Sequence, residues 1–234
     1  MLVVLRYVIS KKFYMKSIFI SRSLETESAF YKAFPKEKNK IFDLPLINIV
    51  KIPFSYTPQT DWIFFTSKNA IKYFFEQNPT LPDNVKYGVI SSSSENALIA
   101  FGKKADFIGD GVDLREIAKC FRIKLGNESV LFPQAMDSLQ TIQKQLAFTN
   151  TTYNLYTYKT ILKTEFDLPY TDIAIFTSPS NVRAYFSKYK LDPRQIIIAM
   201  GTSTKYLLSE YGIKNVLIPK QFSEIGLCEI LTKQ

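Results

Sequence analysis

The stretch DIAIFTSPSNVRAYF, residues 172–186, decides the fold because residues 61–75, DWIFFTSKNAIKYFF, repeat it. Aligned without gaps, the two stretches are identical at five positions, which are Asp61/Asp172, Phe65/Phe176, Thr66/Thr177, Ser67/Ser178 and Phe75/Phe186. Each copy is typical of a buried strand that runs through a Thr-Ser turn into an amphipathic helix. One structural unit is therefore predicted to occur twice.

Outward from the repeat, short apolar runs alternate with segments of helical period, which is typical of parallel α/β architecture. Strands are predicted at 16–21, 39–44, 61–66, 86–91, 105–108, 129–133, 150–157, 172–177, 195–200 and 214–218. Helices are predicted at 24–34, 68–77, 94–102, 113–124, 137–147, 179–189, 203–211 and 222–232.

Strand counting shows that the second copy of the repeat is followed by two strands fewer than the first copy. The strand, helix and strand that begin at Ile18 match, in order and spacing, those that begin at Leu131. We therefore expect the N-terminal segment to complete the C-terminal unit.

The predicted fold class is α/β, with two similar flavodoxin-like domains that have parallel five-stranded sheets, one of them discontinuous, joined by a two-stranded connector. The discontinuous domain is expected at 15–46 plus 160–234, and the inserted α/β domain at 53–152. The β-prone crossings 47–52 and 153–159 are the expected connector strands. Open α/β sheets bind ligands at the carboxyl ends of their strands, so a cleft between the domains is expected there.

The composition limits the possible functions. The net charge of +9 favours an anionic partner, but Lys and Arg are dispersed rather than clustered in the stripe that nucleic-acid binding needs. The sequence contains no histidine, which excludes a Ser-His-Asp triad, a histidine base and a histidine-ligated metal within it. No stretch approaches the roughly 20 apolar residues of a membrane span.

The two cysteines and the N-terminal segment lead to separate interpretations. Cys120 and Cys228 have neither metal-site spacing nor a disulfide framework, and we interpret them as buried inert thiols. In residues 1–14 the charges follow the apolar run, unlike a signal peptide, so we interpret this segment as an extension before a natural start at Met15. A packed edge strand is the alternative. We expect a cytoplasmic monomer.

Hydroxyl side chains stand where several helices are predicted to begin. The groups are Thr66, Ser67 and Lys68; Ser92, Ser93 and Ser94; Thr177, Ser178, Ser180 and Asn181; and Thr202, Ser203 and Thr204. A helix amino end offers unpaired N–H groups and partial positive charge to an anion. Ordinary helix caps use the same residue types, so only the repetition together with the positive charge favours an anion-binding site.

Four motifs in this order resemble those of the uroporphyrinogen-III synthase family. They are the paired FTS turns, LFP at 131–133, Tyr158-Lys159-Thr160, and IIIAMGTSTKYLLSEYG at 196–212. The resemblance covers about 16–232 and agrees with the discontinuous topology. It implies a lyase of tetrapyrrole (haem or sirohaem) biosynthesis that closes hydroxymethylbilane, a polycarboxylate linear tetrapyrrole, to uroporphyrinogen III. The resemblance further implies that the terminal ring is inverted through an azafulvene cation and a spiro intermediate, that water is lost, and that no cofactor or metal takes part.

The resemblance also implies roles for particular residues. Tyr158 would help the terminal hydroxyl to leave, since a phenol with a pKa of about 10 stays protonated at neutral pH. One alternative is that Tyr156, not Tyr158, corresponds to the family tyrosine. The other is that Tyr158 is a connector residue that only packs against a strand. Arg22 would meet a substrate carboxylate, unless it is a solvated surface arginine. The Thr-Ser and Gly-Thr-Ser-Thr turns would bind the substrate.

Two departures weaken the ligand contacts expected in the inserted domain. Ser92 and Glu95 stand where the family often has a second Gly-x-x-Thr turn, and the region of Ser138 and Leu139 lacks a basic residue. The alternative function is a non-catalytic two-domain protein that binds a small anion and closes about its connector.

Overall fold

The computed structural model describes residues 16–109 and 113–232, so the extension expected at 1–14 lies outside the described residues. The chain divides into two compact units. Unit 1 runs to Asn48 and resumes at Leu162, and unit 2 is Ile49–Ile161. Among the described residues, no helix has the length and apolar character that crossing a bilayer requires.

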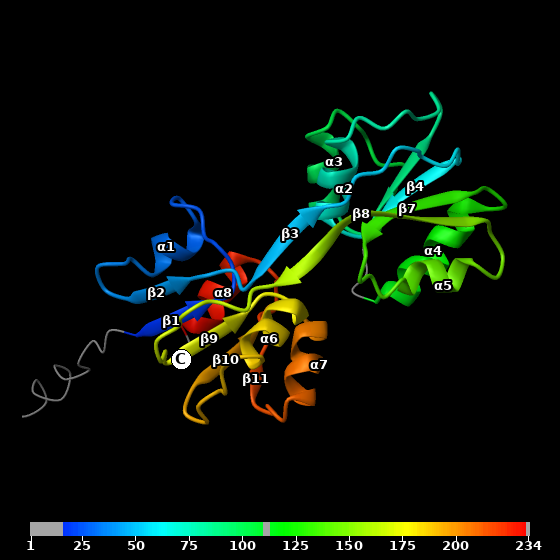
Figure 1. Cartoon of the computed structure of the whole chain (residues 1–234). Coiled ribbons are helices and arrows are strands. Elements are labelled where there is room, and N and C mark those ends of the chain that lie inside the picture. Colours follow the sequence, from blue (N-terminus) through cyan, green and yellow to red (C-terminus); the bar gives the residue numbers. More distant parts are fainter. Residues whose placement is uncertain (1–15, 110–112, 233–234) are drawn as a thin grey trace, which may run out of the picture. The chain divides into compact units, whose positions relative to one another are not determined.

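Unit 1 is built on a five-stranded sheet of order β11-β10-β9-β1-β2 in which every paired strand is parallel (Figure 1). Its strands are β1 (Ser17–Ile20), β2 (Lys40–Asp43), β9 (Ile173–Phe176), β10 (Ile196–Ala199) and β11 (Val216–Leu217). Its helices are α1 (Ala29–Ala33), α6 (Pro179–Phe186), α7 (Thr202–Glu210) and α8 (Glu224–Leu231). Numbered along unit 1, the strand order is 2-1-3-4-5, as in one common doubly wound sheet.

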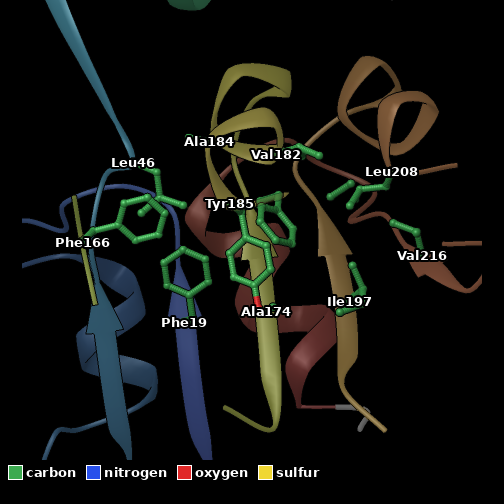
Figure 2. Close-up of a cluster of buried hydrophobic side chains, with 12 residues drawn as sticks. Phe19, Leu46, Phe166, Ala174, Val182, Ala184, Tyr185, Ile197, Leu208 and Val216 are labelled. Atoms are coloured by element: carbon green, nitrogen blue, oxygen red, sulfur yellow. The ribbon is translucent and has the colours of Figure 1, made fainter. Parts of the chain in front are cut away.

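The strands of unit 1 are buried on both faces, which explains their continuous apolar runs. One face packs against α6 and α7, where the ring of Tyr185 stacks on Phe19 over strand β9 (Figure 2). The other face, with Ile18, Ile20 and Ile175, packs against Phe30 of α1 and Leu227 of α8. Helices on both faces leave the strand ends as the places where polar side chains can meet a ligand.

Unit 2 contains the repeat at 61–75 in a six-stranded sheet of order β3-β8-β7-β4-β5-β6. Its strands are β4 (Trp62–Phe65), β5 (Lys86–Val89), β6 (Phe107–Ile108) and β7 (Val130–Ala135), together with β3 (Ile47–Lys51), which begins in unit 1, and β8 (Thr152–Leu162), which ends in unit 1. Its helices are α2 (Lys68–Phe75), α3 (Ser92–Ile99), α4 (Leu114–Leu125) and α5 (Thr141–Leu146).

Strand β8 differs from the prediction, which placed two overlapping segments here, a sheet strand at 150–157 and a connector strand at 153–159. β8 is one strand of 11 residues that pairs in parallel with β7 through its first half. Its second half runs antiparallel to β3, with Ile52 N–H donating to Thr157 and Lys163 N–H donating to Leu46. The sequence TYNLYTYKTIL contains no glycine or proline that would end the strand, so it continues from one pairing into the other.

In unit 2, strands β7, β8, β4, β5 and β6 correspond to strands 1 to 5 of unit 1. Numbered in this way, they lie in the sheet in the order 2-1-3-4-5, so the two units have the same strand order. A repeated side-chain contact supports this equivalence. Asp172 accepts from the backbone N (2.8 Å) and Oγ (2.6 Å) of Ser17 at the start of β1. Asp61 accepts from the same two atoms of Ser129, before β7, at 2.8 and 2.7 Å. The aspartate shared by the two repeats therefore joins neighbouring strands.

Two helices are about half as long as predicted, namely those expected at 24–34 and at 137–147. The helix expected at 24–34 begins only after Ser28, because the Leu24 N–H donates to Asp43 Oδ2 (3.0 Å) and the intervening residues form a turn. The helix expected at 137–147 is reduced to α5. The interpretation of both cysteines as buried was wrong, since Cys120 lies on the exposed face of α4 and Cys228 is partly exposed.

Candidate active site

In unit 2, the Thr66–Ser67 turn joins the carboxyl end of β4 to α2. Ser67 is the N-cap of α2, and its Oγ accepts from the backbone N of Ala70 at 3.0 Å. The same Oγ lies 3.0 Å from the hydroxyl oxygen of Tyr158 on β8. Ser67 thus connects the amino end of a helix to the tyrosine that the sequence marked as a candidate acid.

Tyr158 is oriented by a β-bulge. Gln134 and Ala135 of β7 pair with Tyr156 and Tyr158, so Thr157 between them is an extra residue. Without the bulge, residues 156 and 158 would lie on the same face of β8. With it, Tyr156 is 39% exposed, whereas Tyr158 is 7% exposed and packs in the core beside α2.

The surroundings of Tyr158 keep its hydroxyl protonated. Burial raises the pKa of Tyr158 above its ordinary value, and the hydrogen bond with Ser67 partly offsets this increase. The charge of Asp137 and the neighbouring hydroxyl of Tyr73 raise the pKa further. The Tyr73 ring lies 5.6 Å from that of Tyr158. The site therefore holds a neutral phenol that can donate a proton at neutral pH.

In unit 1, the matching Thr177–Ser178 turn is fastened to neighbouring segments. Thr177 N–H donates to Ser21 Oγ (2.8 Å), and the Thr177 hydroxyl donates to the Ser21 carbonyl (3.0 Å). The Asn181 amide donates to Ser178 Oγ (2.9 Å) and accepts from the backbone N of Leu46 (2.9 Å). Asn181 is only 3% exposed, so its side chain holds the turn against the segment that leads into β3.

Arg22 follows β1 and is already paired within unit 1. Its guanidinium donates to Glu224 in the first turn of α8, and the second oxygen of Glu224 accepts from the Phe30 N–H at 3.3 Å. The Arg22 side chain is 35% exposed, so it reaches solvent while its charge is balanced.

The remaining candidates differ in exposure. Lys68, Thr202 and Ser203 are exposed at the starts of α2 and α7, and Ser180 and Thr66 are half-buried. Thr204 is 2% exposed and lies in the core of unit 1. Gly201 is the N-cap of α7 and brings no side chain, so no side-chain cap occupies the first N–H groups of that helix.

The departures noted in the sequence remain visible in the structure. Glu95 lies in the first turn of α3, where its charge opposes an anion, and Leu139 is 79% exposed without a basic neighbour in sequence. A cavity of about 270 Å³ in unit 2 is lined by Asp61, Lys86 and Glu128, among others. It lies at the amino ends of the strands, away from the candidate residues.

Sequence reasoning missed three side chains that contact the candidates, namely Ser21, Tyr73 and Glu224. Ser21 and Glu224 are 156 and 202 residues from the side chains that they contact, so no local pattern could have indicated the contacts. Tyr73 had a local signal, because it lies on the helix that follows the Thr-Ser turn.

Comparison with known proteins decides the family. The sequence model of the family described as "Uroporphyrinogen-III synthase HemD" matches residues 36–229, which include both copies of the repeat. The chain belongs to the uroporphyrinogen-III synthase family. Membership confirms the resemblance, the enzyme class and the link to tetrapyrrole biosynthesis, and it does not favour a non-catalytic binding protein.

The individual relatives are distant from this chain in sequence. The chain is 26% identical to the "Uroporphyrinogen-III synthase" of Chlorobaculum parvum, with 89% of this chain and 94% of that protein covered. It is 22% identical to the "Porphyrin biosynthesis protein HemD" of Ruminiclostridium josui, with 92% of this chain covered, but it spans only 48% of that protein's length. The crystal structure of the Helicobacter pylori uroporphyrinogen-III synthetase is similar in fold, with a TM-score of 0.70, 22% identity, and 94% and 99% of the two chains covered.

Proposed function

We propose that this chain converts hydroxymethylbilane to uroporphyrinogen III, inverting the terminal pyrrole ring with loss of water. The observation that carries the proposal is the family match over residues 36–229. The reaction suits the composition, since it needs no histidine and the sequence contains none.

Tyr158 is the proposed general acid. Its proton passes to the terminal hydroxyl of the substrate, the C–O bond breaks with its electron pair on oxygen, and water leaves behind an azafulvene cation. Ring closure at the inverted ring later releases a pyrrole proton, which restores the phenol, so no net proton is consumed. The raised pKa of Tyr158 supports this role because it keeps the proton in place until an acceptor is bound.

Helix amino ends and polar side chains that are exposed or half-buried are the proposed carboxylate contacts. In unit 1 these are the Ser180 N–H at the start of α6 and the first N–H groups of α7, with the hydroxyls of Ser178, Ser180, Thr202 and Ser203. Lys68 and Thr66 serve the same purpose in unit 2. The buried side chain of Asn181 instead holds the Thr177–Ser178 turn in place, and the buried Thr204 is not available for such a contact. Arg22 contributes charge only where a substrate carboxylate competes with Glu224.

Two further expectations extend the proposal. The matching strand orders support two flavodoxin-like domains, one of them discontinuous, joined by β3 and the second half of β8. We also propose that the enzyme acts as a cytoplasmic monomer. Size measurement by light scattering with and without substrate would test the monomer, and a dimer-sized particle would contradict it.

The test supplies freshly made hydroxymethylbilane, oxidises the products and separates their isomers. Unassisted closure gives the uninverted type I isomer, so the enzyme is expected to give type III. If the protein binds hydroxymethylbilane but leaves the isomer ratio at the level of the buffer, the binding-protein alternative replaces the proposal.

A further inference from the structure

We infer that Ser67 is a positioning residue that directs the hydroxyl proton of Tyr158 toward the substrate. The inference rests on the proposed function and gives Ser67 a role different from the substrate contact expected from the sequence. Its basis is the pair of contacts at Ser67 Oγ, 3.0 Å to the backbone N of Ala70 and 3.0 Å to Tyr158 Oη.

The hydrogen-bond inventory of Ser67 gives the direction. A serine hydroxyl has one hydrogen and two acceptor lone pairs, and the Ala70 N–H occupies one lone pair. If Ser67 donates its hydrogen to Tyr158 Oη, the serine is satisfied and the phenol hydrogen stays available for an acceptor outside the protein. If Tyr158 donated to Ser67, the phenol hydrogen would be used inside unit 2 and the serine hydrogen would need another partner. Ser67 as donor is therefore the arrangement in which Tyr158 acts as an acid.

The same hydrogen bond also favours release of the proton. When Tyr158 loses its proton, the phenolate forms in a site only 7% exposed, where charge is poorly solvated. The hydroxyl of Ser67 donates to that phenolate, and its hydrogen bond lowers the pKa of Tyr158 against the effect of burial. Donation from Ser67 to Tyr158 and on to the substrate is also cooperative.

The other copy of the repeat has no such arrangement, which shows that helix capping alone does not require it. Ser178 occupies the position of Ser67, but its Oγ accepts from both the backbone N (3.3 Å) and the side-chain amide (2.9 Å) of Asn181. Both lone pairs are used within α6. The position of Asn181 is Ala70 in unit 2, and this smaller residue leaves Ser67 Oγ free to contact Tyr158.

The experiment replaces Ser67 with glycine, because glycine at an N-cap costs only a few tenths of a kcal/mol relative to serine. Ser67→Thr restores a hydroxyl, and Asp113→Ala is the matched control, since it removes the side-chain cap of α4 in the same unit. Two quantities are measured for each variant. The first is kcat and KM for hydroxymethylbilane. The second is the pH titration of Tyr158, followed by NMR of ¹³C-labelled tyrosine and assigned with Tyr158→Phe.

We expect Ser67→Gly to lower kcat about 10- to 100-fold, the range for one lost hydrogen bond to a charged group, with little change in KM. It should also move the Tyr158 titration to higher pH, and Ser67→Thr should restore both quantities. Asp113→Ala should change neither. A Ser67→Gly variant with an unchanged Tyr158 titration overturns the inference, and so does an equal loss of kcat in Asp113→Ala. The titration needs no turnover, so it tests the inference even if the enzyme assay rejects the proposed reaction.

Discussion

Replacing Asn181 with alanine tests whether this residue holds the fold or binds substrate. The substitution removes the acceptor of the Leu46 N–H (2.9 Å) and the donor to Ser178 Oγ (2.9 Å) and Thr177 Oγ1 (3.3 Å). Leu46 is fully buried, so its N–H is left without a partner at a cost of about 1–3 kcal/mol. The two hydroxyls are half-buried and can turn to water, which adds about 1 kcal/mol. We expect unit 1 to lose about 2–4 kcal/mol of unfolding free energy.

Urea unfolding followed by circular dichroism measures this loss. With a slope of about 2 kcal/mol per molar urea, the midpoint of unit 1 should fall by about 1–2 M. The single tryptophan, Trp62, lies in unit 2, so its fluorescence reports that unit separately. Amide exchange at Leu46 should also accelerate. Asn69→Ala, an exposed position in the first turn of α2, is the control and should change stability by less than about 0.5 kcal/mol. If Asn181→Ala were as stable as this control while KM rose, Asn181 would be a substrate contact and the reasoning would be refuted.

Three further predictions follow from single contacts. Gly88→Ala should destabilise unit 2 by about 1–3 kcal/mol in thermal unfolding, because the new Cβ would lie 2.5 Å from the fully buried ring of Phe64; an unchanged melting temperature would contradict this. Asp172→Asn should destabilise unit 1 at pH 7. The hydrogen bonds from Ser17 lower the pKa of Asp172, so its stabilisation is complete above about pH 4 and is lost as the pH falls through the lowered pKa. The urea midpoints of variant and parent should converge there, and a constant difference would count against the contact. Tyr158→Phe should lower kcat about 100-fold or more, and an unaltered kcat would remove the acid role. In the parent protein, the activity that depends on this proton should decline only at alkaline pH, because the raised pKa of Tyr158 keeps the phenol protonated through neutrality.

The repeat was sufficient to predict most of the fold, because periodicity and turn residues are local properties. The two predicted strands of the repeat, Trp62–Phe65 and Ile173–Phe176, and the helices that follow them are confirmed. The contact that the repeated aspartates make could not be predicted. Asp172 and its partner Ser17 are 155 residues apart, and only the completed sheet brings them together.

The candidate site was less predictable because its geometry depends on one extra residue. Alternation along a strand puts Tyr156 and Tyr158 on one face, and only the bulge at Thr157 separates them. In the same way, the position of Asn181 at a helix start is compatible with a ligand contact or with a cap. Only its hydrogen bond from the Leu46 N–H distinguishes these roles. The roles of the site residues in the reaction stay predictions until the variants are measured.

The central claim is tested most directly by the isomer ratio formed from hydroxymethylbilane. The parent protein, incubated with the fresh compound, should give predominantly type III uroporphyrinogen, and Tyr158→Phe should give less type III at an unchanged rate of unassisted type I formation. If the folded parent protein gave type I alone, at the rate seen in buffer, the proposed reaction would be contradicted.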